Sequence, residues 1–280
     1  MKLPFCCQSV ALPLLLLGFV SGATLTGSAQ DKSIISSPKV LVITREFTKP
    51  GKDGSPHQKT EGAFVHAMAQ YKATDHYYAV TSLSGPSRAL FLSSYPSFAA
   101  LEAERKSVDS NAPLAAALDS ANIADGDLLS STESSMWVQR EDLSLNPGFR
   151  VGSRIEEITQ FRIKPGHFKE WEDLVKLVLE GYKKGIPDAH WGAYEEAYGS
   201  PGGGFLIIIT MKSAAEIDAN FAAGKKFEEA MGEDGMKKMA LLMASCVESE
   251  QTNLFRIDPK MSYPTDEMVQ ADPGFWKAKP

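Results

Sequence analysis

Two histidines stand at matching places in the chain, each directly before aromatic residues. His76 precedes Tyr77 and Tyr78, and His190, which lies 114 positions later, precedes Trp191. Imidazole exchanges a proton near neutral pH and can ligate haem. The pair therefore predicts either a proton-transfer group or haem ligand, or two residues that only cap strand edges in water.

A second group combines aromatic and ionisable residues. Arg162 lies on one predicted strand, Tyr194 and Glu195 lie on the next, and Trp171 lies on the helix between them. Together with Trp191 they would line a pocket that is mostly aromatic with a few polar groups, as ligand sites often are. The alternatives are an edge strand whose charges face water and a place in the core for Trp171.

These patterns lead to specific site assignments. A carboxylate and an imidazole beside aromatic walls can shift their pKa values towards neutrality, so His190 and Glu195 are the candidate catalytic acid and base. The candidate ligand-binding residues are Arg162, Trp171, Trp191, Tyr194, His76 and Tyr78.

Strong catalytic and metal signatures are absent from the sequence. It contains no G-x-S-x-G, P-loop, H-E-x-x-H or C-x-x-C motif. No two of the five histidines have the i, i+4 spacing of a helical metal site, and His57 and His167, near helix starts, are expected at the surface. The sequence therefore predicts no metal site and no cofactor.

The elements that position these residues follow one order twice. The first copy is predicted as strand 40–47, helix 57–72, strands 76–83 and 89–94, helices 97–106 and 113–121, and strand 132–140. The second is predicted as strand 155–163, helix 167–184, strands 190–198 and 205–211, a helix from 213, a helix at 236–243, and strand 247–256. Lys49 and Lys164 differ by 115 positions, as do Glu133 and Glu248, which indicates an internal duplication.

Each copy therefore has the β-α-β-β-α-(α)-β order of a ferredoxin-like unit, whose sheet carries helices on one face only. The cheapest cover for the open face is the sheet of the other copy, so we expect an α+β fold of two tandem repeats packed sheet to sheet. On this element order, the chain resembles the dimeric α+β barrel superfamily in fused form. The resemblance implies a pseudo-dimeric barrel within one chain. It also implies relatives that include cofactor-independent monooxygenases, haem-handling enzymes, small-lactone isomerases and stress proteins.

The N-terminus reads as an export signal. Lys2 precedes an apolar run that is too short to anchor stably in a bilayer, and small residues allow cleavage after Ala23 or Ala29. The alternative is an uncleaved N-terminal anchor. The expected divisions are a signal peptide at 1–29, a linker at 30–38, repeat 1 at 39–142, a linker at 143–149, repeat 2 at 150–258 and an extended C-terminal tail at 259–280. The expected location is periplasmic or secreted.

The composition limits the partners. The formal net charge is -6 and the sequence has no basic run, which disfavours nucleic acid and anionic membrane surfaces. Three functions stay open. The first is an exported protein that binds a small apolar or aromatic molecule; the second is an oxygenase-, isomerase- or haem-type enzyme of the superfamily; and the third is a non-catalytic interaction scaffold.

Overall fold

The computed structural model describes residues 33–277. The predicted signal peptide lies outside these residues. Repeat 1 consists of β2 (Val40–Thr48), α1 (Ser55–Gln70), β3 (Tyr77–Ser82), β4 (Arg88–Tyr95), α2 (Phe98–Ser110), α3 (Ala112–Gly126) and β5 (Leu129–Gln139). Repeat 2 consists of β7 (Ile155–Ile163), α4 (Phe168–Gly185), β8 (Gly192–Tyr198), β9 (Gly204–Met211), α5 (Ala215–Cys246) and β10 (Val247–Tyr263).

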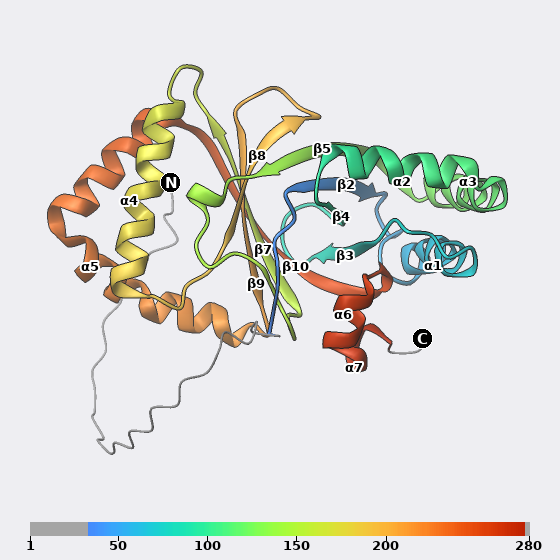
Figure 1. Ribbon diagram of the computed structural model, residues 1–280. Coiled ribbons are helices and arrows are strands. Elements are labelled where there is room, and N and C mark those ends of the chain that lie inside the picture. The colour runs from blue at the N-terminus through green and yellow to red at the C-terminus, as the bar shows by residue number, and fades with distance from the viewer. Residues whose placement is uncertain (1–32, 278–280) are drawn as a thin grey trace, which may run out of the picture.

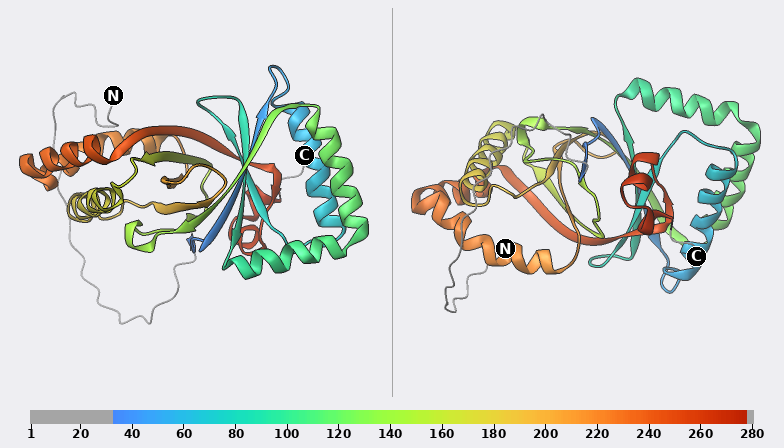
Figure 2. Two further views of the ribbon diagram at one scale, coloured as in Figure 1. Left: turned by 90° about the horizontal axis from the view of Figure 1, so that it is seen from above. Right: turned by 60° about the horizontal axis from the view of Figure 1, so that its bottom comes forward.

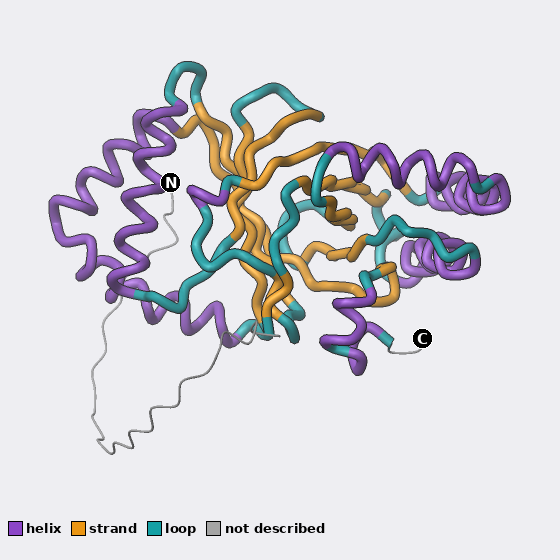
Figure 3. Tube along the Cα trace, in the orientation of Figure 1, coloured by secondary structure: helices purple, strands orange, loops and turns teal. Residues whose placement is uncertain are grey.

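The eight strands of the two repeats, orange in Figure 3, form one closed antiparallel barrel. Their order around the barrel is β10-β3-β4-β2-β5-β8-β9-β7. Each repeat contributes a four-stranded ferredoxin-like sheet, and the sheets join through the β5–β8 and β10–β3 pairs. The fold class predicted from the duplication, two tandem ferredoxin-like repeats in a pseudo-dimeric α+β barrel, is confirmed. Closure leaves no exposed sheet edge within the barrel.

The helices form two layers on opposite sides of the barrel. Helices α1, α2 and α3 cover the outer face of the repeat 1 sheet, and α4 and α5 cover the outer face of the repeat 2 sheet (Figures 1 and 2). Along β2, Leu41 and Ile43 belong to the cluster inside the barrel, whereas Val40 and Val42 belong to a cluster with Leu101 of α2. The period of two in a strand thus supplies both the inner core and the helix-facing core.

Repeat 2 has the larger helix-facing core. Helix α4 buries Trp171, Leu174, Val175 and Leu179 at helical spacing, and they pack with Phe205 and Phe227. Two separate helices were predicted after residue 213. They are the two arms of α5, which meet at Gly232, whose φ is 67°. Residues that carry a side chain rarely adopt a positive φ of this size, so glycine permits the kink.

The two segments predicted as linkers contact each other. The short strands β1 (Ile34–Ile35) and β6 (Phe149–Arg150) pair antiparallel, and Ile35 and Phe149 pack against the cluster inside the barrel. A 3-10 turn, η1 (Glu141–Leu143), precedes β6. The β1–β6 pair covers one end of the barrel, whereas Leu143 and Leu145 of the second segment pack into the helix-facing core of repeat 2.

The C-terminal segment is not the extended tail that its prolines predicted. Strand β10 continues to Tyr263, and the chain then forms α6 (Asp266–Ala271) and α7 (Pro273–Trp276). Met268 and Trp276 belong to the cluster inside the barrel. Burial of these two large side chains outweighs the local preference of proline for extended backbone. No helix within 33–277 is long and apolar enough to cross a membrane.

Candidate functional site

Two cavities lie inside the barrel, one towards each end. The first, which we call the Glu156 cavity, has a volume of about 480 Å³ and includes Leu41, Tyr78, Glu156, Tyr194 and Ile208 in its lining. The second, which we call the arginine cavity, has a volume of about 510 Å³. Between them the barrel is filled by apolar side chains such as Ile43, Ile158 and Leu206. Both volumes lie in the range of small-molecule sites.

Glu156 is the only carboxylate of the Glu156 cavity with no exposed surface; Glu267, its other carboxylate, is exposed. Glu156 lies on the inner face of β7, the same face as Ile158, which is two residues later. Its Oε1 accepts a hydrogen bond of 2.9 Å from the Tyr78 hydroxyl, whereas its Oε2 is buried and has no partner. Burial raises the pKa of Glu156 to about 7, although the Tyr78 hydrogen bond opposes the rise. The carboxyl group can therefore gain or lose a proton near neutral pH.

The two tyrosines of the cavity come from different repeats, Tyr78 from β3 and Tyr194 from β8. Burial raises the pKa of Tyr194 to about 12, against the lowering effect of a hydrogen bond with Ser37. Burial, followed by the nearby Glu156, also raises the pKa of Tyr78. Both phenols thus stay protonated at neutral pH and can donate hydrogen bonds beside one ionisable carboxyl group. This arrangement can bind a polar atom of an otherwise apolar molecule and exchange a proton with it.

The arginine cavity contains cations that already have partners. Arg45 donates a hydrogen bond of 2.7 Å to Ser135 Oγ, and Arg88 lies 5.0 Å above the ring of Phe255. Arg162 donates to the carbonyl oxygens of Pro201 and Gly202 in the β8–β9 turn. The arginines therefore hold the end of the barrel together, and Arg162 lines a different cavity from Tyr78 and Tyr194.

His190 and Glu195, the predicted catalytic pair, line none of the cavities described here. His190 Nε2 lies 2.8 Å from the Thr210 carbonyl oxygen, and burial lowers the pKa of its imidazole. Glu195 accepts a hydrogen bond of 2.8 Å from Arg140 and keeps 43% of its side-chain surface exposed. The structure thus gives each residue a separate local partner and does not bring the two into one pocket.

The remaining predicted ligand contacts are also spread over the molecule. Trp171 packs between Phe161 and Phe205 in the repeat 2 core, with ring centroids 4.8 and 5.2 Å away. Trp191 Nε1 donates to the Leu143 carbonyl oxygen at 2.9 Å. His76 stacks on Tyr263 and lines a third, more open cavity between α1 and the C-terminal segment. Of the predicted residues, only Tyr78 and Tyr194 meet in one barrel cavity.

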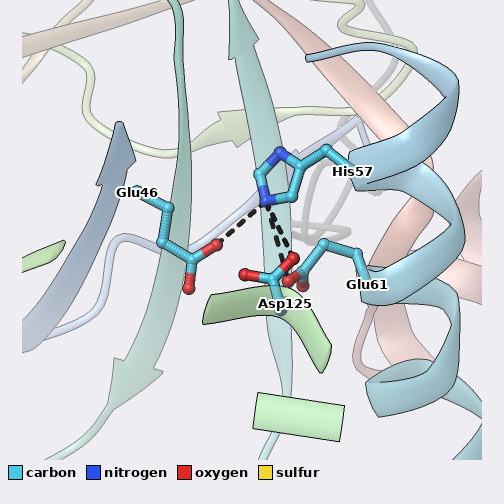
Figure 4. A group of neighbouring side chains, drawn as sticks. All are labelled: Glu46, His57, Glu61 and Asp125. Carbon is cyan, nitrogen blue, oxygen red and sulfur yellow. Dashed lines mark hydrogen bonds and ion pairs between the residues drawn. The ribbon is translucent and has the colours of Figure 1, made fainter. Parts of the chain in front are cut away.

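Sequence reasoning missed a buried ionisable cluster in repeat 1, formed by Glu46, His57, Glu61 and Asp125 (Figure 4). His57, expected at the surface, is only 3% exposed. Burial, followed by the charges of Glu46 and Asp125, raises the pKa of Glu61 to about 10. The available signal was the i, i+4 spacing of His57 and Glu61, which puts both on one face of a helix.

Solved structures with a similar architecture are known. A candidate monooxygenase from Fusobacterium nucleatum subsp. nucleatum aligns with a TM-score of 0.52 and 11% identity over 79% of this chain and 93% of that one. A mutant chlorite dismutase from Candidatus Nitrospira defluvii aligns with a TM-score of 0.50 and 10% identity over 85% of this chain and 98% of that one. The chain has the fold of the dimeric α+β barrel superfamily. No protein-family model and no curated protein matches the sequence.

The resemblance to dimeric α+β barrels implied haem as one possible ligand, which a histidine could ligate. Neither barrel cavity is lined by a histidine. Between the repeat 2 sheet and its helices, Trp171, Phe205 and Phe227 fill the space. Between the repeat 1 sheet and α1, the ring of His57 lies among three carboxylates. The barrel cavities and these two sheet–helix interfaces therefore present no histidine open to a haem, whereas the third cavity is lined by His66 and His76.

Proposed function

We propose that the protein binds a small, mostly apolar or aromatic molecule in the Glu156 cavity. The observation that carries this proposal is the unpartnered Oε2 of Glu156, which is fully buried in a cavity with largely apolar walls. A buried polar atom without a partner costs free energy, and a ligand that supplies a hydrogen-bond donor removes this cost. The phenols of Tyr78 and Tyr194 would orient such a ligand.

The N-terminal pattern supports export as part of this proposal, so the ligand would be met outside the cytoplasm. The pattern rests on residues 1–29 alone. The cavity itself belongs to the described barrel and is independent of where the protein works.

A second proposal is that the same cavity performs proton transfer on its ligand, as an isomerase-type or cofactor-independent enzyme would. Burial raises the pKa of Glu156 to about 7, so its carboxylate can take a proton from a bound acidic C–H or O–H group and return it. Similarity to a candidate monooxygenase agrees with an enzyme but shows the fold alone.

The test uses 1-naphthol as the probe, because it is aromatic and carries one hydroxyl donor. Binding to wild type, Glu156→Gln and Glu157→Gln is measured by fluorescence titration at pH 6 and pH 8. Glu157 is the matched control because it neighbours Glu156 on β7 but takes the alternate register, towards the helices. We expect wild type to bind more tightly at pH 8 and Glu156→Gln to lose about tenfold at that pH, the equivalent of one charged hydrogen bond.

Glu157→Gln should behave like wild type. If Glu156→Gln binds as tightly as wild type, or if wild type does not bind, the binding proposal fails. For proton transfer, the same variants are mixed with 2-tetralone in D₂O, and exchange of its α-hydrogens is followed by NMR. Equal exchange rates in wild type and Glu156→Gln would exclude the carboxyl group as the base.

A further inference from the structure

The ionisable cluster of repeat 1 joins three elements. Glu46 lies on β2, His57 and Glu61 lie one turn apart on α1, and Asp125 lies near the end of α3 (Figure 4). His57 Nε2 is 3.1 Å from Glu46 Oε2, 3.5 Å from Asp125 Oδ1 and 3.8 Å from Glu61 Oε1. One ligand atom from each of the four residues lies within 4.8 Å of the others. The side chains therefore converge on one point from three directions.

The charges of the cluster are unbalanced. It holds three carboxylates and a single imidazole, and within residues 33–277 no lysine or arginine forms an ion pair with any of the carboxylates. The side chains of His57, Glu61 and Asp125 are 4%, 4% and 2% exposed, so water screens them little. Burying several like charges is strongly unfavourable unless protons or a cation neutralise them.

One ligand atom in the cluster has no hydrogen bond. Glu61 Oε1 is buried and lacks a hydrogen-bond partner, and Glu61 as a whole is only 3% exposed. Figure 4 shows its carboxylate directed at the same point as those of Glu46 and Asp125. An orphaned, fully buried carboxyl oxygen that faces other ligand atoms either carries a proton or lacks a positive partner.

The separations measured from His57 Nε2 suit a metal ion, although the shortest of them is also a hydrogen bond with Glu46 Oε2. Adjacent donors bound about 2.1 Å from an ion lie about 3.0–3.5 Å apart in a tetrahedral or octahedral set. The two shorter separations from His57 Nε2, 3.1 and 3.5 Å, fall in this range, and the third, 3.8 Å, is close to it. The Thr60 hydroxyl lies 2.5 Å from Asp125 Oδ1 and can fix the orientation of that carboxylate, as groups around metal ligands commonly do.

We propose that Glu46, His57, Glu61 and Asp125 bind one divalent first-row transition ion. The imidazole favours such ions over Ca²⁺ and Mg²⁺, which prefer all-oxygen sets. Four protein donors make a closed set, which is typical of structural sites. The ion would connect α1 and α3 to the sheet of repeat 1. Glu46, the most exposed member with 14% of its side chain accessible, marks the side from which an ion enters.

The experiment uses tag-free protein stripped with a chelator and then titrated with Zn²⁺ or Co²⁺. Bound metal is measured by elemental analysis after desalting, and Co²⁺ binding is followed by its visible absorption. The variants are Glu61→Gln, which keeps the side-chain shape, and Glu46→Gln, whose position is more tolerant because it is partly exposed. The matched control is His167→Gln, since His167 follows the equivalent Lys-Pro-Gly turn in repeat 2 and pairs only with Glu170 at 3.3 Å.

Wild type and His167→Gln should each retain about one ion per chain and gain thermal stability on adding metal. Glu61→Gln and Glu46→Gln should bind at least about tenfold more weakly and lose the metal-dependent rise in Tm. Thermal unfolding of each metal-free variant checks that it is folded. The proposal is overturned if wild type retains no ion after desalting, or if both folded cluster variants retain it as wild type does.

Discussion

The two repeats place different chemistry at the same position of the same fold. Glu46 on β2 and Phe161 on β7 are 115 positions apart, the offset that also relates Lys49 and Lys164. Glu46 meets His57 of α1 at 3.1 Å, whereas Phe161 packs on Trp171 of α4 with ring centroids 4.8 Å apart. Both residues extend from the outer face of the sheet to the first turns of the covering helix. The comparison shows that the fold requires a buried contact at this place but does not fix its polarity.

The two interfaces should contribute differently to stability. The repeat 2 interface removes large apolar surfaces from water, which is directly stabilising. The repeat 1 interface buries carboxylates whose desolvation offsets much of the energy of their pairing with His57. Stability should therefore depend most on repeat 2, whereas its dependence on pH above about 8, beyond the pKa of about 7 of Glu156, should arise mainly in repeat 1.

The largest expected effect is the loss of an aromatic side chain from the apolar interface. Trp171 is 2% exposed and packs on two phenylalanines. Trp171→Ala should lower the free energy of unfolding by about 3–5 kcal/mol, as measured by urea denaturation. Phe168→Ala, at a position on the same helix that is 42% exposed, should cost less than about 1 kcal/mol. Similar losses in the two variants would contradict a concentrated apolar core.

A smaller effect should come from pH acting on the polar interface. The pKa of Glu61 is raised from 4.5 to about 10 in the folded chain, first by burial and then by the charges of Glu46 and Asp125. The folded state therefore binds more protons between these values. The stability that the Glu61 proton contributes to the folded state is fully present below about pH 4.5. It is lost as the pH rises towards about 10.

Urea unfolding of the chelator-treated protein at pH 8 and pH 9 measures this effect, because Glu156, with a pKa of about 7, is already largely ionised there. Wild type should lose stability by at most about 1.4 kcal/mol per pH unit for this one proton. Glu61→Gln should show a flatter dependence, whereas Glu170→Gln, at a half-exposed site of repeat 2, should keep the wild-type slope. An unchanged slope in Glu61→Gln would show that the cluster does not titrate as its burial implies.

The smallest effects are expected at the pair first assigned to catalysis. Glu195 forms a half-exposed ion pair with Arg140, so Glu195→Gln should change stability by less than about 1 kcal/mol. His190→Gln and Glu195→Gln should each bind 1-naphthol within about twofold of wild type, a difference below 0.5 kcal/mol or so. A tenfold loss in either variant would place the binding site at that residue and away from the Glu156 cavity.

Much of the architecture could be predicted from sequence because the hydrophobic pattern of each strand and helix is local and periodic, and because the same order of elements occurs twice. The strand at 155–163 was placed with its observed bounds, and the order of elements in both repeats led to the barrel. The C-terminal segment was missed because four prolines outweighed Met268 and Trp276 in the prediction. Whether two apolar side chains find a cavity depends on residues that are distant in sequence, and no local pattern reports it.

The candidate sites show the same limit. Tyr78 and Tyr194 were chosen for their aromatic and polar character, and they meet at Glu156 because β3 and β8 bring them together. The ionisable cluster of repeat 1 combines residues between positions 46 and 125 from three elements. Only its His57–Glu61 pair is close enough in sequence to be recognised from a local pattern. Tertiary packing supplies the remaining neighbours. Burial then shifts the ionisation of residue types, such as glutamate, that are usually found at the surface.

Strand β10 pairs with β7 along its first part and with β3 along its second, so one strand belongs to both halves of the barrel. In a barrel made from two identical chains, every substitution occurs twice and on both sides of the symmetry axis. Here the halves are covalently one molecule, so a residue can change in one half while its counterpart stays the same. This broken symmetry is what allows an acidic cluster behind one sheet and an aromatic core behind the other.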